Sequence, residues 1–334
     1  MKNRGITTLT IVAALLVGGL GSPLTTTLAG SKHHPLNFKS IDDGEILYVP
    51  RDYATIQSAV NAAGEGDTIL VATGVYSENV VVSTSDVRLR GGGDVVLDGT
   101  SLSGIGIHVL GASATAPVTG VEVSDFEVRN FERGIIVEWA TKARVSDNYV
   151  HDNVDRLAPA VLGDGTGIEL VTASASDVSD NVVSRNGLGG IQLRVGSTDN
   201  TIHHNRVDEN GSQSSTFDGV GILVTGAGTD NNQVQHNKIV ANFGRGILLS
   251  RPPGTVPLSG NLVAHNRAHR NLRAGIAIMF AATGNTVVHN DARENNLSGL
   301  PPCFHCNLFD LSIGGNTWDK NLGTFNETDA SCLQ

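Results

Sequence analysis

Val145-Ser-Asp-Asn148-Tyr-Val150-His-Asp-Asn153 is the stretch that decides the fold of this chain. Its pattern is an apolar residue, two spacers, Asn, one spacer, an apolar residue, two spacers and Asn. Internal repetition of this kind is typical of solenoid proteins, in which each repeat stacks on the next. Further copies occur at Val178–Asn186, Ile202–Asn210, Val234–Asn242, Val263–Asn271, Val287–Asn295 and Ile313–Asn321.

A second element, Gly-Ile followed by a variable and an apolar residue, separates the copies. Alternation of apolar and variable residues over a few positions indicates a short strand rather than a helix. Each coil is therefore predicted to hold three short strands: the Gly-Ile strand, one before the first Asn and one between the two Asn residues. The Gly-Ile runs are Gly134–Val137, Gly167–Leu170, Gly190–Leu193, Gly221–Val224, Gly246–Leu249 and Gly275–Ile278.

Strands this short must stack on their own copies, at about 4.8 Å per coil, to bury Ile, Val and Leu in one core. Asn suits the corners because it tolerates the left-handed backbone and can bond the Asn of the next coil in a ladder. Turn asparagines in a β-sandwich are the alternative, but sandwich strands lack a fixed repeat. We predict an all-β fold, a single right-handed parallel β-helix.

The N-terminal end of the solenoid is predicted to be covered by a short amphipathic helix at residues 54–63. Ile56, Ala59 and Val60 share one face of it, and Asp52 is expected to cap its start. Residues 46–325 are assigned to the β-helix and residues 326–334 to a C-terminal tail. Residues 1–30 combine basic, apolar and small polar segments in the order of a signal peptide.

Composition suits a tightly turned solenoid, and secretion is expected from the signal-peptide pattern. The chain has 40 Gly in 334 residues, 4% aromatic residues and a net charge of −10. The acidic balance excludes a basic nucleic-acid footprint. The apolar run near the N-terminus is too short for a confident membrane anchor, so no stable membrane insertion is expected after signal cleavage. We expect a monomer that is extracellular or periplasmic.

At its start the chain resembles the pectin-lyase-like superfamily. The residues that carry the resemblance are Tyr53-Ala-Thr-Ile-Gln57, Gly66–Val71 and Gly74-Val-Tyr-Ser-Glu78, together with the later repeats. The superfamily includes periplasmic copper-accessory proteins and many secreted proteins that bind or cleave sugars. The resemblance implies the β-helix fold but leaves the activity open, because this fold hosts lyases, hydrolases, esterases, epimerases and non-enzymes.

No catalytic motif of a superfamily member is matched intact. Asp42-Asp43 lies before the helix, where the Asp-Asp pair of polygalacturonases does not belong. Arg251-Pro-Pro does not complete the arginine motif of pectate lyases. Tyr149-Val-His151-Asp152 has the residue types of mannuronan epimerases in another order. The catalytic residues must therefore be sought from position alone.

Three insertions leave the same corner of the coil, at residues 154–166, 211–220 and 296–307. Insertions that leave the same corner form a wall along one side of a face, and that face is usually the binding face. The Gly-Ile strands are therefore predicted to floor a groove, polar in its N-terminal half and apolar in its middle.

Outward residues of these strands are the candidate catalytic groups. Glu138, Glu169 and Arg194 are expected on three successive coils, where the two carboxylates divide acid and base roles and the arginine stabilises charge. A salt-bridged polar surface without chemistry is the alternative reading. Candidate substrate-binding residues are His108, His151, Asp152, Gln192 and Asp164.

A column of histidines is the competing candidate. His204, His236, His265 and His289 each precede an Asn of the repeat, so stacking places four imidazoles in a row. Such a column could bind a transition metal, but a straight row offers poor tetrahedral geometry, and tolerated corner histidines are the alternative. Among Cys303, Cys306 and Cys332, one disulfide is plausible, and a zinc site with His305 is the weaker reading.

Three functions follow from the sequence. The first is a polysaccharide lyase or glycoside hydrolase with a glycan laid along the groove. The second is a non-catalytic glycan-binding protein, and the third is a periplasmic metal-linked accessory protein that uses the histidine column. The negative charge favours a neutral glycan, or an acidic one bridged by Ca²⁺, and no cofactor is otherwise required.

Overall fold

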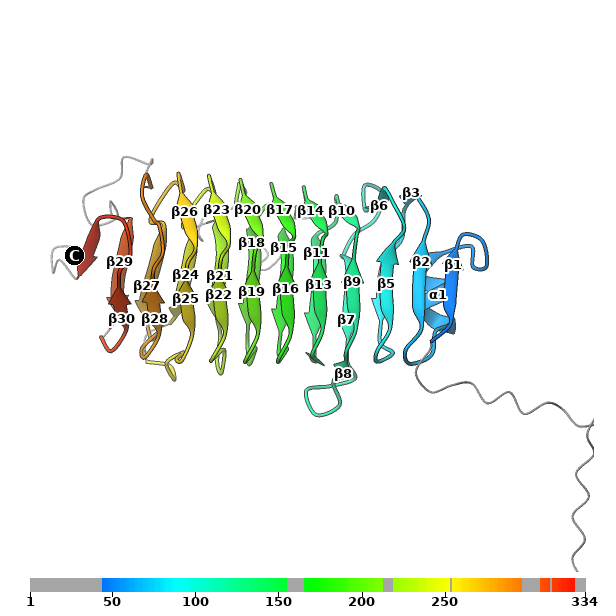
Figure 1. Ribbon diagram of the computed structural model, residues 1–334, viewed down its shortest axis with the longest axis horizontal. Coiled ribbons are helices and arrows are strands. Elements are labelled where there is room, and N and C mark those ends of the chain that lie inside the picture. Colours follow the sequence, from blue (N-terminus) through cyan, green and yellow to red (C-terminus); the bar gives the residue numbers. More distant parts are fainter. Residues whose placement is uncertain are drawn as a thin grey trace, which may run out of the picture. The chain divides into compact units, whose positions relative to one another are not determined.

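The repeating stretch winds into a parallel β-helix, as predicted. A computed structural model describes residues 44–154, 165–212, 219–252, 254–295, 307–312 and 314–327. Within them, short strands from successive coils lie side by side in parallel sheets (Figure 1). The coil is right-handed. The predicted signal peptide, residues 1–30, lies outside the described residues, as does most of the predicted tail.

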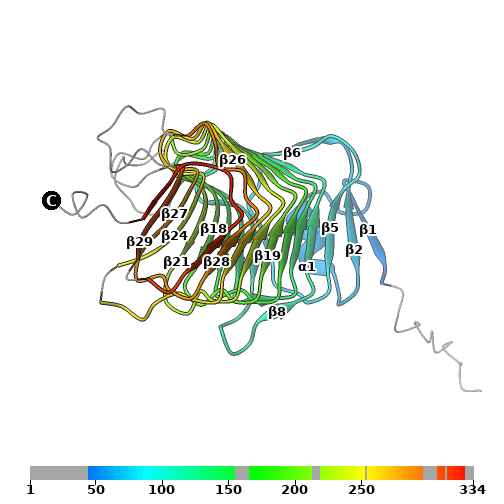
Figure 2. The same cartoon turned by 60° about the vertical axis from the view of Figure 1, so that its left-hand side comes forward.

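Three long sheets, named A, B and C here, form the faces of the coil (Figure 2). Sheet A contains β1 (Ile46–Val49), β2 (Thr68–Val71), β5 (Arg88–Gly91), β9 (Glu122–Ser124), β13 (Arg144–Ser146), β16 (Asp177–Ser179), β19 (Thr201–His203), β22 (Gln233–Gln235), β25 (Leu262–Ala264), β28 (Thr286–Val288) and β30 (Thr317–Asp319). Sheet B contains β3 (Gly74–Tyr76), β6 (Val95–Asp98), β10 (Glu127–Arg129), β14 (Tyr149–His151), β17 (Val182–Ser184), β20 (Arg206–Asp208), β23 (Lys238–Val240) and β26 (Arg267–His269).

Sheet C holds the Gly-Ile strands. It contains β4 (Val80–Val82), β7 (Ile105–Leu110), β11 (Arg133–Glu138), β15 (Thr166–Val171), β18 (Gly189–Arg194), β21 (Val220–Thr225), β24 (Ile247–Arg251), β27 (Ile276–Phe280), β29 (Leu308–Ser312) and β31 (Phe325–Glu327). A small pair, β8 (Val118–Thr119) and β12 (Ala140–Thr141), lies apart from these sheets.

The core is one continuous column because the strands pair in register. In sheet A, Val145 is the Cα partner of Val178, which in turn pairs with Ile202. All three side chains are buried, at 0–1% exposure. The same alignment continues in sheets B and C, so each inward apolar residue packs against its counterpart in the next coil.

Asparagine ladders close the corners of the coil. The backbone N–H and the Nδ2 of Asn181 both donate to Oδ1 of Asn205, each over 3.0 Å. Nδ2 of Asn181 also donates to the carbonyl of Val145, 2.9 Å away in the preceding coil. The predicted ladders are therefore confirmed, and the amide of Asn181 is buried and hydrogen-bonded to both neighbouring coils. The first ladder is Asn148, Asn181, Asn205, Asn237, Asn266, Asn290 and Asn321, and the second is Asn153, Asn186, Asn210, Asn242, Asn271, Asn295 and Asn307.

The structure adds a third ladder, which the sequence analysis missed. Asn200 donates to Oδ1 of Asn232 from its backbone and its side chain, at 3.1 and 3.0 Å. The sequence signal was an Asn two residues before each inward residue of sheet A. This ladder comprises Asn200, Asn232, Asn261, Asn285 and Asn316.

The third ladder corrects the alignment of the last repeat. Ile313–Asn321 was aligned with Val287–Asn295, but Trp318 is the Cα partner of Val287, and Asn290 donates to Oδ1 of Asn321. The predicted alignment was wrong because every corner carries an Asn, so the same spacing fits two registers.

The left-handed residue at each corner is also not the one that was expected. It precedes the ladder Asn and carries a positive φ, 57° at Asp180, 56° at His204 and 57° at His236. The Asn itself must turn its amide into the core to make the ladder, so the preceding residue absorbs the turn and points outward. Asp, Asn and His are the side chains that tolerate this conformation best.

Glycine in the Gly-Ile strands is required by close packing. A Cβ on Gly167 would lie 2.5 Å from Cγ1 of Val183, 2.7 Å from Nδ2 of Asn186 and 2.9 Å from the carbonyl oxygen of Gly190. The first atom of any side chain would therefore collide with the ladder and with the next coil.

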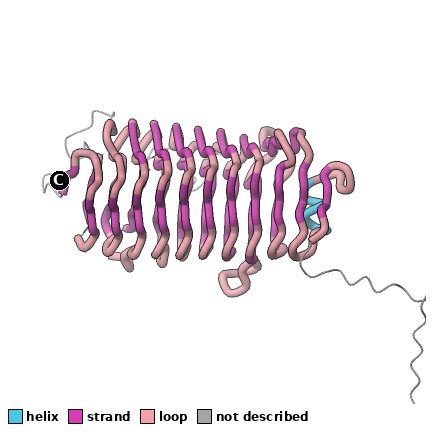
Figure 3. Tube along the Cα trace, in the orientation of Figure 1, coloured by secondary structure: helices cyan, strands magenta, loops and turns pink. Residues whose placement is uncertain are grey.

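The predicted helix covers the N-terminal end of the coil as α1 (Ile56–Ala62), with Ile56, Ala59 and Val60 buried (Figure 3). Thr55, not Asp52, caps it, because Thr55 directly precedes the first turn and accepts from the backbone of Ser58. No helix among the described residues is long and apolar enough to cross a membrane.

Glu78 explains the Gly-Val-Tyr-Ser-Glu motif. Its two carboxylate oxygens accept hydrogen bonds from the backbone N–H groups of Ile56 and Gln57, and each N···O distance is 2.9 Å. A negative charge at a helix N-terminus is favourable, so this residue fastens the cap to the coil.

Replacing Glu78 by Ala is expected to lower the free energy of unfolding by about 1–2 kcal/mol, the usual effect of losing an N-terminal cap. Urea denaturation of the variant would measure it. Glu65→Ala, at an exposed site just after the helix, is the matched control and should change stability by less than about 0.5 kcal/mol. Equal effects of the two substitutions would contradict the role of Glu78.

Candidate functional site

The outer face of sheet C presents the predicted catalytic residues on consecutive strands. Glu138, Glu169 and Arg194 come from β11, β15 and β18, which are neighbours in the sheet. Glu138 and Arg194 are both aligned with Val171 of the strand between them, so they share one row across the sheet. The predicted placement on three successive coils is therefore correct.

A second row lies two residues closer to the start of each strand. In it, His108 aligns with Ile136, Ile136 with Glu169, and Glu169 with Gln192. Farther along the sheet this row becomes apolar, as predicted for the groove floor. Val220, Leu248, Ala274, Ala277 and Phe309 form a buried cluster there, with Leu223, Met279 and Leu311 packed against it.

Glu169 is the buried, ion-paired residue at the centre of the polar part of sheet C. Only 1% of its side chain is exposed, and Nη1 of Arg194 donates to its Oε1 over 2.7 Å. Arg133 approaches the other carboxylate oxygen to 3.7 Å. A buried carboxylate held between two guanidinium groups is well placed to fix their positions. Arg133 was not among the predicted residues, although its outward position at the start of β11 could have indicated it.

Glu138 forms a separate pair with His108. Oε2 of Glu138 lies 3.0 Å from Nε2 of His108, and the two side chains are 27% and 14% exposed. Burial lowers the pKa of His108, although the hydrogen bond that its ring donates to Glu138 opposes that shift. The imidazole is therefore neutral at pH 7, and the half-exposed carboxylate is the more accessible of the two predicted acid–base groups.

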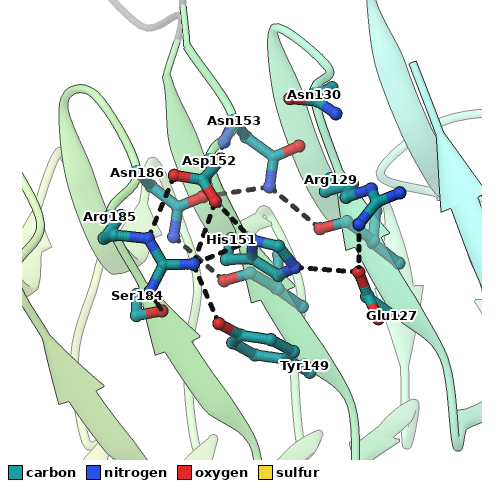
Figure 4. Close-up of polar contacts among 12 residues, drawn as sticks. Glu127, Arg129, Asn130, Tyr149, His151, Asp152, Asn153, Ser184, Arg185 and Asn186 are labelled. Atoms are coloured by element: carbon teal, nitrogen blue, oxygen red, sulfur yellow. Dashed lines mark hydrogen bonds and ion pairs between the residues drawn. The ribbon is translucent and has the colours of Figure 1, made fainter. Parts of the chain in front are cut away.

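His151 and Asp152 belong to a different cluster, on sheet B (Figure 4). Nδ1 of His151 lies 2.6 Å from Oδ2 of Asp152, and Nε2 lies 3.2 Å from Oε1 of Glu127. The ring stacks on Tyr149 with 4.0 Å between the centroids. Arg185 donates to both carboxylate oxygens of Asp152, at 3.1 and 2.9 Å, and to Oη of Tyr149 at 2.9 Å.

Charge pairing organises this sheet B cluster. Burial tends to raise the pKa of Asp152, but hydrogen bonds from Arg185 and His151 lower it on balance. Asp152 in turn raises the pKa of Arg185. The residues of the cluster form hydrogen bonds and ion pairs with one another across adjacent coils, so the geometry indicates that they hold neighbouring coils together. The predicted substrate-binding residues therefore divide between two faces, with His108 and Gln192 on sheet C and His151 and Asp152 on sheet B.

Other predicted features lie outside the described residues. Asp164, Cys303, Cys306 and Cys332 are among them, as are most of the three insertions expected to wall the groove.

The predicted histidine column is present as a stack of parallel rings. Centroids of His204 and His236 are 5.3 Å apart, and those of His236 and His265, and of His265 and His289, are 5.0 Å apart. The ring planes are within 10° of parallel, and all four side chains are exposed. Desolvation and the neighbouring rings of His265 and His204 lower the pKa of His236.

Stacking prevents neighbouring rings of this column from binding one ion. The lone pair of an imidazole lies in the ring plane, and a metal ion must lie in that plane at about 2.0–2.1 Å. Parallel planes that are stacked cannot meet at such a point. No group of three or more His, Cys, Asp or Glu side chains in the described part of the chain is arranged to hold a metal ion.

His203, at the end of β19, breaks the pattern of the column. Its ring is perpendicular to that of His204, at 83°, and the two Nδ1 atoms are 2.7 Å apart. Nε2 of His203 lies 2.7 Å from Oδ2 of Asp177. The sequence analysis missed this residue, although the doubled His203-His204 is visible there.

Comparison with known families matches residues 60–299 to the model described as "Periplasmic copper-binding protein (NosD)". This range is more than half of the chain. No curated protein sequence matches significantly.

Among solved structures, the complex of XylC with xylose superposes with a TM-score of 0.58 at 12% identity, over 84% of this chain and 69% of that one. The C387A mutant of DFA-IIIase from Arthrobacter chlorophenolicus A6, in complex with DFA-III, gives 0.54 at 16% identity and 86% of each chain. Pectate lyase Pel9A gives 0.51 at 14% identity, over 86% and 80%. At these identities the likeness shows the fold alone, which is the pectin-lyase-like β-helix.

Proposed function

This chain belongs to the NosD family of periplasmic copper-binding proteins, and we propose that it works outside the cytoplasm as a carbohydrate-binding β-helix. The family is described as periplasmic, and the N-terminal residues have the pattern of a signal peptide. Neighbours of the same fold include a pectate lyase and a protein in complex with xylose. These likenesses support a glycan ligand without identifying it.

The observation that carries the proposal is the polar half of sheet C. Two ion-paired groups lie next to each other on its outer face, the Glu138–His108 pair and the line of Arg133, Glu169 and Arg194. Side chains of Arg133 and Arg194 are 33% and 35% exposed, so their outer N–H groups can reach a ligand laid across the strands. Fixed donors and acceptors of this kind suit the hydroxyl groups of a sugar.

Each residue has a distinct role in this proposal. Glu138, which is hydrogen-bonded to His108, acts as the general acid or base that donates or accepts a proton of the substrate. Arg194 binds the ligand near the reacting bond. Glu169 is a positioning residue, because its 1% exposure leaves it little contact with a ligand. The net charge of −10 favours a neutral polymer over an acidic one, unless Ca²⁺ bridges the two.

Glu138→Gln is expected to reduce turnover of the preferred neutral glycan by about 10²–10⁴-fold, the usual contribution of a general acid or base. Binding should remain within a factor of a few, since the amide keeps the shape of the side chain. A panel of neutral and acidic polysaccharides, with and without Ca²⁺, would be screened for binding by calorimetry and for cleavage by reducing-end release.

Glu122→Gln is the matched control, because Glu122 is a half-exposed carboxylate on sheet A that pairs with Arg88 at 3.6 Å. It should affect neither binding nor cleavage. Binding without cleavage by the unmodified protein would support the non-catalytic form of the proposal. Failure of the unmodified protein to bind any glycan would contradict the carbohydrate role. Full activity of the Glu138 variant would contradict the assignment of Glu138 as the acid–base residue.

A further inference from the structure

Two neighbouring coils carry basic side chains and no carboxylate along the arc that runs from sheet A across sheet B. We name residues 232–243 and 261–272 the basic arc. Its strands in sheet B, β23 and β26, are neighbours in that sheet. In a chain of net charge −10 the arc is a local excess of positive charge that the sheet C site does not use. Its charged or titratable side chains are Lys238, Arg267, Arg270, His236, His265 and His269.

Lys238 and Arg267 present their positive charge to the solvent. Both side chains are exposed, and the two residues are Cα partners across β23 and β26. Among the described residues, no carboxylate forms an ion pair with either of them. Nε of Arg267 donates to Nδ1 of His269 over 3.4 Å, which leaves the two Nη groups of the guanidinium for an external anion.

The coils on either side hold carboxylates that arginines of the same coils already neutralise. Asp208 pairs with Arg206 at 3.2 Å, and Asp291 pairs with Arg293 at 2.8 Å. Asp291 also lies 2.9 Å from Nε2 of His269. These pairs leave the positive charge of the arc uncompensated by its neighbours. The other charged or titratable groups that face the arc from these two coils are His203, His204, Glu209, His289 and Glu294.

Two large apolar side chains lie at the end of the arc. Phe243 and Leu272 each follow an Asn of the second ladder, so they occupy the same corner on adjacent coils. Their exposed fractions are 51% and 36%. Exposed aromatic and aliphatic side chains beside basic ones are typical of surfaces that rest in the interface of a membrane. A soluble polyanion would leave these two side chains in water, so their position favours a lipid surface.

We propose that the basic arc docks this protein on an anionic lipid surface, with Lys238 and Arg267 at the phosphate groups and Phe243 and Leu272 in the interface. Stacking of the coils places equivalent side chains on a line, so they reach a flat surface together. Charges elsewhere on the acidic chain oppose docking little, because they are screened beyond about 10 Å at about 0.1 M salt. This docking is peripheral, requires no membrane-spanning helix and does not depend on the glycan site.

The histidine column makes the docking depend on pH. His236 and His265 belong to the arc, and His204 and His289 extend the stack on either side of them. Histidine gains a positive charge as the pH falls through about 6.5. Desolvation and the rings of His265 and His204 lower the pKa of His236, so charging of the whole stack requires a lower pH. Docking is therefore expected to strengthen from about pH 7.5 to about pH 5.5.

Co-sedimentation of the whole chain with lipid vesicles tests the proposal. Vesicles of equimolar phosphatidylcholine and phosphatidylglycerol should bind it more tightly than vesicles of phosphatidylcholine alone. Lys238→Gln combined with Arg267→Gln should weaken binding to the anionic vesicles by about 20–30-fold, since each basic residue contributes about fivefold. Phe243→Ser combined with Leu272→Ser should weaken it by at least about threefold and leave binding to soluble dextran sulfate unchanged.

Lys142→Asn combined with Arg144→Gln is the matched control, because it also removes two exposed positive charges, from a coil outside the arc. Asn suits residue 142, where φ is 55°. Vesicle binding by this control should stay within about a factor of two of the unmodified protein. The apolar run at residues 6–20 is the same in every variant, so differences between variants report on the arc.

Three results would overturn the proposal. The first is equal binding to neutral and anionic vesicles, and the second is a loss for the Lys142/Arg144 variant as large as that for the Lys238/Arg267 variant. The third is binding to dextran sulfate without binding to either vesicle, which would identify a soluble polymer as the partner. Circular dichroism of each variant would confirm that the fold is intact.

Discussion

Asn237→Ala is expected to lower the free energy of unfolding by about 3–5 kcal/mol, because several buried groups lose their partners at about 1–3 kcal/mol each, with incomplete additivity. Oδ1 of Asn237 accepts two hydrogen bonds from Asn205, both of 3.0 Å. Its Nδ2 donates to the carbonyl of Ile202 at 2.8 Å and to Asn266 at 3.0 Å. No water can replace these contacts, since the residue is 2% exposed.

Urea denaturation followed by circular dichroism would measure the loss, and hydrogen exchange would show whether the coils on either side separate as independent units. Gln233→Ala is the control, because this exposed side chain lies on the outer face of sheet A and belongs to none of the ladders. It should cost less than about 0.5 kcal/mol. If the two variants were equally stable, the ladder would not hold the corners together.

Arg194→Met is expected to cost about 2–3 kcal/mol, since it leaves the buried carboxylate of Glu169 with Arg133 alone, 3.7 Å away. The value is below the ~3–5 kcal/mol typical of fully buried pairs because 35% of the Arg194 side chain is exposed. Adding Glu169→Leu should restore stability to within about 1 kcal/mol of the unmodified protein, since the unpaired charge is then removed.

Arg90→Met is the matched control for this cycle. Arg90 pairs with Asp125 at 3.2 Å, but the two side chains are 64% and 39% exposed. Solvent screens such a pair, so the loss should be below about 1 kcal/mol. A large loss for Arg194→Met that Glu169→Leu did not recover would contradict the anchoring role of Glu169, and the arginine would then act mainly by packing.

The fold could be predicted because the coils stack in register, which converts a spacing in the sequence into a position in space. Val145, Val178 and Ile202 are neighbours for this reason alone. The register of the last repeat could not be read in the same way, because Asn316 and Asn321 fit the motif at two different corners. Repetition identifies the coil but does not distinguish between corners that use the same residue.

The candidate site was less predictable, since side chains on the same face of a sheet can contact different partners. Glu138 and Glu169 were expected to act together, but one pairs with His108 and the other with Arg133 and Arg194. His151 was expected beside the groove, but it turns to Glu127 and Asp152 on sheet B. Register fixes the backbone spacing, whereas these choices depend on side-chain length, burial and local charge.

The ladders give the solenoid a direction. Within a ladder, each Asn donates its backbone N–H and one N–H of Nδ2 to the Asn of the coil that follows it in the chain, and its oxygen accepts from the coil before. The other N–H of Nδ2 donates to a carbonyl of the preceding coil. A chain cut short at its C-terminus would leave two donors of each last ladder Asn without their acceptor, the backbone N–H and one N–H of Nδ2. Loss of coils from the N-terminus would leave one N–H of Nδ2 and the side-chain oxygen without their partners, and unmet lone pairs of an oxygen are better tolerated than unmet N–H groups. During synthesis each newly made coil would therefore supply the acceptors that its predecessor lacks, so that assembly advances from the capped end and locks one coil at a time.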